Sequence, residues 1–305
     1  MNVLVKSDSA FTSKCRKLQD YYRVKVLDAE AGRGPTISSE HTYGNYVVNG
    51  KEKNLNFLNE YSFRFAKQKV NEKQINPDLT IDEYRLFNNL LSSMPMAFNL
   101  FGLLRKILED NPKEASNIGH FVFSGIGWLH QILYIDIEFI PRPIEFYTND
   151  KSAFDVFIKG CDNNGKPGII TIETKYTDLL GSNSSKNNEK KIELLTSLDL
   201  VDDSQIQFFQ KSGFGQLERN FLLTLAYKRN HNFRYFDHII LSPQEDKKSI
   251  KEINSFTAKL KKYSEQIHKY DLEKFIIDAQ KSDSKEYKEL AAKFYDRYLN
   301  YSLVA

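Results

Sequence analysis

The sequence is poor in cysteine, in tryptophan and in charge of one sign. Its 305 residues include two cysteines and one tryptophan, and 43 lysines and arginines nearly balance 40 aspartates and glutamates. Two cysteines cannot build the disulfide framework of a small secreted protein, so we expect a reducing cytoplasm. A net charge of +3 gives no global basic signature, so a nucleic-acid partner would have to meet local basic side chains.

Several common signatures are also missing. No apolar run reaches the length of a membrane span, and the N-terminal residues lack the apolar core of a signal peptide, so no membrane association is expected. The six histidines form no i, i+4 pair, which argues against a zinc site. The glycines around Arg33 are not followed by Gly-Lys-Ser/Thr, and no Gly-x-Ser-x-Gly elbow is present. The chemistry must therefore come from other groups, and carboxylates are the candidates.

Carboxylates occur inside two apolar runs, residues 154–158 and 168–176. The connection between the runs is rich in turn formers, with Asn164-Gly165 at its centre, and this pattern predicts a β-hairpin. Because side chains alternate along a strand, Glu173 and Lys175 share one face of the second strand, and Asp155 points away from its apolar neighbours on the first. Two carboxylates and an ammonium can then meet on one side of a small sheet.

This combination suits metal-assisted hydrolysis of a phosphodiester. Asp155 and Glu173 would be the metal ligands, and Mg²⁺ (or Mn²⁺) would activate a water and neutralise charge on the phosphate. Lys175 would orient the water or stabilise the transition state. The alternative is that the three residues are an ordinary charged group on an exposed strand face.

Three segments resemble a restriction-endonuclease-like branch of the PD-(D/E)xK nuclease superfamily. Residues 173–178, Glu-Thr-Lys-Tyr-Thr-Asp, are similar to its EVKYTE signature, and Asp155 matches the acidic residue that precedes it. Residues 92–102 resemble its SSQ…FNLFG segment, with Met94 in place of glutamine, and residues 216–220 resemble its QxxRN helix start. The strict Pro-Asp pair is absent before Asp155, but neither departure removes a metal ligand.

The resemblance implies a cytoplasmic, metal-dependent endonuclease that acts on DNA, in prokaryotic restriction or anti-phage defence. It adds Gln216 as a catalytic residue and Arg219 and Asn220 as substrate-binding residues near a helix N-terminus, where phosphate is favoured. Arg219 has the alternative of a surface ion pair. A partner protein or a homodimer is compatible with this interpretation. Two rivals stay open: a catalytically silent nucleic-acid-binding subunit of a defence complex, and an RNA-directed nuclease.

The rest of the chain predicts an α/β fold with a restriction-endonuclease-like core, a mixed sheet flanked by helices. We expect an N-terminal arm and helical extension over residues 1–90, the nuclease core over 91–245 and a C-terminal helical region over 246–305. Two further acidic residues, Glu109 and Glu145, are possible additional members of the site. The alternative for Glu109 is a solvated position at the end of a helix, and the alternative for Glu145 is an exposed position on an edge strand.

The secondary-structure expectations are more specific. Thr80 and Glu83 form a predicted capping box for a helix at 81–91, and the glycine-punctuated run 119–133 predicts a buried helix. A strand is predicted at 134–139 that resumes at 144–146. The polar run 181–191 predicts a loop, either a flap over bound nucleic acid or a plain surface loop.

Overall fold

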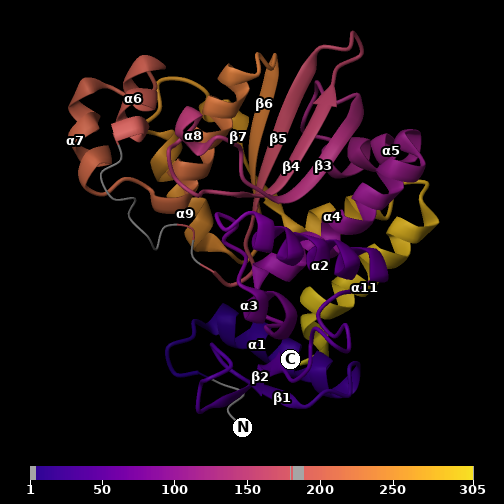
Figure 1. Cartoon of the computed structure of the whole chain (residues 1–305). Coiled ribbons are helices and arrows are strands. Elements are labelled where there is room, and N and C mark those ends of the chain that lie inside the picture. The colour runs from indigo at the N-terminus through magenta and orange to yellow at the C-terminus, as the bar shows by residue number, and fades with distance from the viewer. Residues whose placement is uncertain (1–4, 179, 181–188, 305) are drawn as a thin grey trace. The chain divides into compact units, whose positions relative to one another are not determined.

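A computed structural model describes residues 5–178, 180 and 189–304 of the chain (Figure 1). The chain forms two compact units. The first consists of Met1–Val122, Tyr176–Asp178 and Leu272–Ala305, and the second of Phe123–Lys175 and Leu179–Asp271. Each unit is thus assembled from segments that are separated in the sequence, whereas the three expected segments follow one another along the chain. Helices from both ends of the chain share the first unit.

The second unit contains a five-stranded mixed sheet in the order β3-β4-β5-β6-β7. Its strands are β3 (Gln131–Phe139), β4 (Phe154–Cys161), β5 (Pro167–Thr174), β6 (Tyr235–Ser242) and β7 (Ile267–Asp271). β3, β4 and β5 pair antiparallel, and β5, β6 and β7 pair parallel. The predicted hairpin is confirmed, and Gly165 in its turn has a φ of +74°, which a side chain would disfavour.

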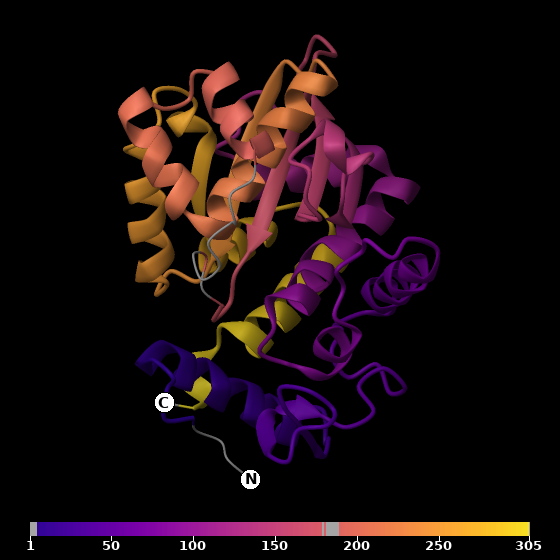
Figure 2. The same ribbon diagram turned by 60° about the vertical axis from the view of Figure 1, so that its left-hand side comes forward.

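In the part of this unit that the structure describes, the sheet is accompanied by the helices α6 (Glu189–Ser197), α7 (Asp203–Lys211), α8 (Gly215–Asn230) and α9 (Lys247–Thr257). These helices lie at the left of Figure 1 and come forward in Figure 2. α8 packs on β5 and β6, and its buried Phe221 joins the sheet residues Phe157 and Ile240 in one apolar core. The helix start predicted at Gln216 is confirmed, and α8 therefore places that residue beside the sheet.

The first unit is mainly helical, with a small two-stranded sheet of β1 (Ala31–Arg33) and β2 (Thr42–Val47). Its helices are α1 (Ala10–Lys25), α2 (Glu60–Ile75), α3 (Glu83–Asn88), α4 (Ser93–Asp110), α5 (Pro112–Val122), α10 (Leu272–Ala279) and α11 (Lys285–Tyr298). Ser92 caps α4 as expected, because its hydroxyl accepts a hydrogen bond from the Met94 amide. Among the described residues, no helix is both long and apolar enough to cross a membrane.

Several local expectations were wrong. The N-terminal arm contains helix α1, whose buried face includes Gln19 and Arg23; these polar residues hide the apolar periodicity. α3 is capped by Asp82, not by Thr80, because the Asp82 carboxylate accepts the Arg85 amide. The run 119–133 is not one helix: α5 ends at Val122, and β3 begins at Gln131 after a glycine-containing turn.

Two strand assignments also need correction. Residues 144–146 form a 3-10 turn, because Pro143 precedes them, and the strand does not resume there. The C-terminal region is not all helical, since β7 lies within it. Helix α9 ends at Thr257, and Tyr263 has a φ of +66°, which no helix continues. Of the polar run 181–191, residues 181–188 lie outside the described residues, and 189–191 begin α6 rather than a loop.

Candidate active site

Asp155 and Glu173 face each other across the β4–β5 hairpin. The register pairs Val156 with Ile172, and the next step along the two antiparallel strands brings Asp155 opposite Glu173. Directly opposed side chains in such a ladder have Cβ atoms about 5 Å apart. The alternation predicted from the sequence therefore places both carboxylates on the same face of the sheet.

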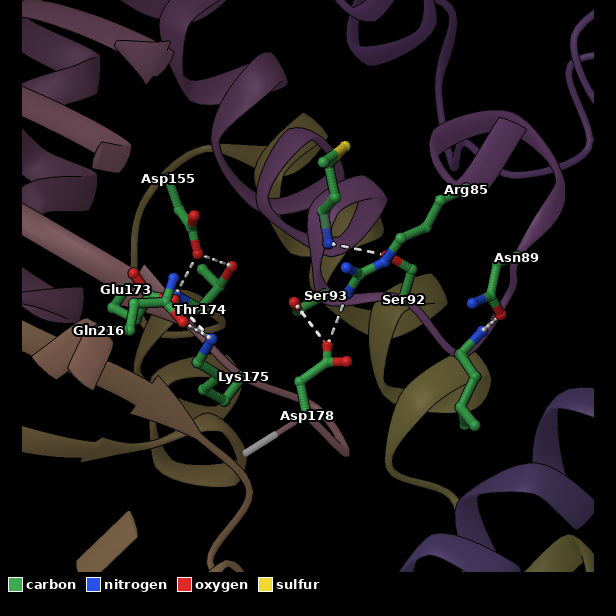
Figure 3. A network of polar contacts seen from close by, with 12 residues as sticks. Arg85, Asn89, Ser92, Ser93, Asp155, Glu173, Thr174, Lys175, Asp178 and Gln216 are labelled. Carbon is green, nitrogen blue, oxygen red and sulfur yellow. Dashed lines mark hydrogen bonds and ion pairs between the residues drawn. The ribbon is translucent and has the colours of Figure 1, made fainter. Parts of the chain in front are cut away.

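Asp155 also closes the end of the ladder (Figure 3). Its Oδ2 accepts hydrogen bonds from the Thr174 backbone amide at 2.8 Å and from the Thr174 hydroxyl at 2.9 Å. The side chain of Asp155 thus takes the place of a backbone acceptor where β5 ends. Two hydrogen bonds from one residue fix the orientation of this carboxylate, which a substrate-bearing site requires.

Glu173 is buried, with 1% of its surface exposed. The pKa of its carboxyl is raised to about 7, mainly by burial and also by the nearby Asp155 charge, and the Lys175 ammonium and the Asn220 hydrogen bond oppose this increase. The Lys175 ammonium lies 2.6 Å from Glu173 Oε1, and both side chains are almost fully enclosed. The structure therefore brings together the three residues predicted from the hairpin pattern.

Helix α8 supplies the remaining polar groups. Lys175 Nζ donates to Gln216 Oε1 at 2.8 Å, so the first turn of α8 holds the lysine (Figure 3). One turn further, the Asn220 amide donates a hydrogen bond to Glu173 Oε2. Gln216 thus lies beside the lysine, and Asn220 contacts a carboxylate of the protein itself.

A buried chain of polar side chains continues behind Asn220. Its backbone oxygen accepts from the Thr224 hydroxyl at 2.7 Å, and the Thr224 hydroxyl lies 2.8 Å from that of Thr171. Thr171 in turn contacts His238 Nδ1 at 2.9 Å. Burial lowers the pKa of His238 to about 3, so the ring is neutral. These contacts tie α8 to β5 and β6 directly behind the carboxylates.

A buried ion pair that the sequence did not reveal fixes the start of α8. Glu218 and Lys191 of α6 are 0% and 4% exposed, and their charged groups lie 2.9 Å apart. Glu218 Oε2 also accepts the Phe214 amide at 2.8 Å, and Lys191 donates to the Phe209 carbonyl. Glu218 was visible only as part of the QxxRN resemblance, and nothing in the residue pattern linked it to Lys191.

The other predicted residues are more peripheral. Arg219 is half-buried on α8, and its charge is one of the influences that oppose the burial-raised pKa of Glu218. Glu145 is exposed in a 3-10 turn rather than on a strand. Glu109 is exposed on α4 and pairs with Arg105 at 3.3 Å, as the solvated-helix alternative expects.

The last residue of the 173–178 segment has a different role. Within the first unit, Asp178 Oδ2 accepts hydrogen bonds from Arg85 Nη2 and from the Ser93 hydroxyl, both at 2.9 Å (Figure 3). Arg85 also donates to the Ser92 hydroxyl at 2.8 Å. Two of the segments that carry the family resemblance are therefore joined by direct contacts at the N-terminus of α4.

The donor set fits a hard divalent cation. Asp155 and Glu173 offer paired carboxylate oxygens, and their mutual repulsion contributes to the raised Glu173 pKa. Among the residues that the structure describes, no group of three or more His, Cys, Asp or Glu side chains is gathered to hold a metal. Two carboxylates are sufficient for Mg²⁺, because it keeps waters and substrate oxygens in its shell.

The model of the PD-(D/E)XK nuclease superfamily matches residues 6–300. The chain therefore belongs to this superfamily, and its class is that of a nuclease. The superfamily expected from the three segments is confirmed, as is the α/β fold with its five-stranded mixed sheet, and the particular branch stays a prediction. Neither the search of curated proteins nor that of solved structures gave a match.

Proposed function

We propose that this protein is a metal-dependent endonuclease that hydrolyses DNA phosphodiester bonds. One observation carries the proposal: the Asp155 and Glu173 carboxylates oppose each other across a hairpin, with the Lys175 ammonium 2.6 Å from Glu173. A restriction or anti-phage setting in a prokaryotic cytoplasm, with a homodimer or a partner protein, is the context that the family resemblance and the scarcity of cysteine support.

Asp155 and Glu173 would hold the metal, Mg²⁺ or Mn²⁺. Bound there, such an ion supplies Lewis acidity toward a phosphate oxygen and lowers the pKa of a coordinated water. Asn220 keeps the Glu173 carboxylate in one orientation through its hydrogen bond, and Thr174 does the same for Asp155. These buried hydrogen bonds therefore orient the two carboxylates.

Lys175 would act on the reacting phosphate. Glu173 and Gln216 hold its ammonium from two sides, so its position is fixed before substrate binds. A fixed positive charge stabilises the additional negative charge of the transition state without a reorganisation cost. Gln216 would position the lysine and the attacking water, and Arg219 on the next turn of α8 would bind a substrate phosphate.

The experiment uses supercoiled plasmid DNA and a single-stranded RNA of mixed sequence as substrates. Each is incubated with the purified protein and Mg²⁺, Mn²⁺ or EDTA, and the products are separated on gels. We expect nicked and linear plasmid with either metal and intact plasmid in EDTA. Cleavage of RNA alone would assign the protein to RNA, and intact substrates in every condition with retained binding would support the silent-subunit alternative.

A further inference from the structure

A polar pocket lies at the opposite end of β5 from the carboxylates. Its volume is about 530 Å³, within the range of ligand pockets. The lining comes from the turn before β3, the β4–β5 hairpin and the first residue of β6, and includes Trp128, His130, Asp162, Asn163, Asn164 and Tyr235. We call this cavity the Trp128 pocket, after the only tryptophan in the sequence.

The indole of Trp128 is held in one position. Its Nε1 donates to Asp237 Oδ2 at 2.6 Å, and His268 Nε2 lies 2.6 Å from the other oxygen of that carboxylate. Gly168 on β5 leaves the space that the indole occupies, since a Cβ there would lie 2.6 Å from the ring. A half-buried aromatic ring that is fixed by a buried carboxylate offers a flat surface at little entropic cost.

Tyr235 extends this surface. Its ring is nearly parallel to that of Trp128, with an angle of 9° between the planes and 5.4 Å between the centroids. The Tyr235 hydroxyl donates to Asp162 Oδ2 at 3.0 Å, so its polar group is satisfied within the protein. Because the two rings are stacked, each covers one face of the other, and only an outer ring face of the pair can be presented to a ligand.

The polar lining selects against phosphate. Among the described residues that form the pocket wall there is no lysine or arginine, and Asp162 contributes a carboxylate. Backbone hydrogen bonds from Lys166 and Asn164 help to lower the pKa of Asp162, so this carboxyl is ionised at neutral pH. The exposed Asn163 and Asn164 carry amide groups that can both donate and accept hydrogen bonds.

A planar, neutral ligand with hydrogen-bonding edges satisfies all of these features. We propose that the Trp128 pocket binds one nucleobase of the nucleic-acid substrate, stacked on the Trp128–Tyr235 pair and contacted at its edge by Asn163 or Asn164. Base–aromatic stacking of this kind does not depend on the base identity, and the amides would add a preference. The inference rests on the proposed function, because it requires a nucleic-acid substrate.

The position of the pocket defines which base it would take. Gly168, which touches Trp128, and Glu173 lie five residues apart on β5, a separation of roughly 17 Å at the usual rise of a strand, and this odd spacing places the pocket and the carboxylates on opposite faces of the sheet. The bound base would therefore belong to a part of the nucleic-acid strand that passes around the sheet, at least several nucleotides from the scissile phosphate. The exposed Lys166 and Arg234, next to the hairpin tip and to Tyr235 in the chain, would meet the backbone of that nucleotide.

The single tryptophan makes a direct test possible. The intact protein is titrated with unlabelled oligothymidylate while the fluorescence emission of Trp128 is recorded. EDTA is present to prevent cleavage. A matched strand of the same length with abasic sugars carries the phosphates without bases. We expect saturable quenching by oligothymidylate and none by the abasic strand, and gels confirm that the strands stay intact.

The affinities of variants for the two strands are then measured by fluorescence anisotropy, with fluorescein-labelled versions of both strands. Trp128→Phe keeps a smaller aromatic ring, so it should weaken binding of oligothymidylate by less than the roughly 5- to 100-fold that complete loss of one stacked base costs, and it should leave the abasic strand unaffected. Asn163→Ala, at an exposed position that folding does not need, should weaken the same strand by a smaller factor. Lys166→Ala is the matched control and should weaken both strands equally.

The outcomes separate the two claims. Unquenched emission from a protein that binds the oligonucleotide, or equal affinities in wild type, Trp128→Phe and Asn163→Ala, would overturn the base pocket while plasmid cleavage still supported the nuclease. Absence of binding and cleavage together would overturn the proposed function and the pocket with it. Plasmid cleavage, together with a loss of affinity in the Trp128 and Asn163 variants that is confined to the oligothymidylate and spares the abasic strand, would support both.

Discussion

The variant Glu173→Gln tests two properties of the Glu173 carboxylate separately: the effect of its burial on the stability of the fold, and its role in binding metal. The glutamine keeps the shape of the side chain and can retain contacts with Lys175 and Asn220, but it carries no charge. In the metal-free protein the pKa of Glu173 is raised from 4.5 to about 7. A raised carboxyl pKa means that the folded state binds the proton more tightly than the unfolded state does. The stability contributed by the protonated carboxyl is therefore present below pH 4.5 and lost as the pH rises through 7.

The magnitude follows from the two pKa values. Their difference corresponds to roughly 3–4 kcal/mol at about 1.4 kcal/mol per pH unit, and most of this falls between pH 5 and pH 8. Other groups that titrate in this pH range are present in both proteins and therefore cancel in the comparison. The free energy of unfolding of wild type minus that of Glu173→Gln should therefore fall by roughly 2–3 kcal/mol from pH 5 to pH 8.

Urea denaturation in EDTA at pH 5, 6, 7 and 8 measures this difference, with the exposed Glu145→Gln as the matched control. The same series with Mg²⁺ at about 100 times its dissociation constant should stabilise wild type by about 2.7 kcal/mol at pH 8 and leave Glu173→Gln unchanged. A pH-independent difference in EDTA would refute the buried, proton-binding carboxylate. Equal stabilisation of both proteins by Mg²⁺ would remove Glu173 from the metal site.

The remaining predictions concern the groups around the two carboxylates. Lys175→Ala should lower the single-turnover cleavage rate far more than the affinity for DNA, and the opposite result in a binding assay would make it a binding residue. Arg219→Ala should reduce cleavage by roughly ten- to a hundredfold, and Arg219→Lys should recover part of the loss. Arg229→Ala on the same helix is the control and should cleave at close to the wild-type rate. Full activity of an Arg219→Ala protein that circular dichroism shows to be folded would contradict a phosphate contact. Lys191→Met and Glu218→Gln should each lower the free energy of unfolding by about 3–5 kcal/mol in urea denaturation. The double variant should lose less than the sum of the two single losses, and additive losses would show that the two residues are not coupled.

The sequence predicted the part of the site that depends on short-range geometry. Alternation along two strands placed Asp155, Glu173 and Lys175 on one face, because a hairpin of known turn fixes its own register. The start of α8 at about Gln216 was also predicted, whereas the hydrogen bond of Gln216 with Lys175 was not. These features follow from residues that are close in sequence or that lie on paired strands.

The features that were missed depend on contacts between distant segments. The ion pair of Lys191 with Glu218 joins two helices, and no local pattern distinguishes a lysine that becomes buried from one that stays solvated. β7 was read as helix because its five residues include polar His268 and Lys269, and a short parallel edge strand carries no alternation of its own. Asn220 resembled a substrate ligand, and only the fold shows its contact with Glu173.

Cleavage of supercoiled plasmid by wild type, Asp155→Asn and the exposed control Glu145→Gln tests the central claim most directly. All three proteins are checked for folding by circular dichroism and assayed under single-turnover conditions with Mg²⁺ and with EDTA. We predict that wild type and Glu145→Gln cut with Mg²⁺ only, and that Asp155→Asn leaves the plasmid intact. Cleavage by a folded Asp155→Asn protein at the wild-type rate, or undiminished cleavage by wild type in EDTA, would contradict a metal-dependent nuclease site built on Asp155 and Glu173.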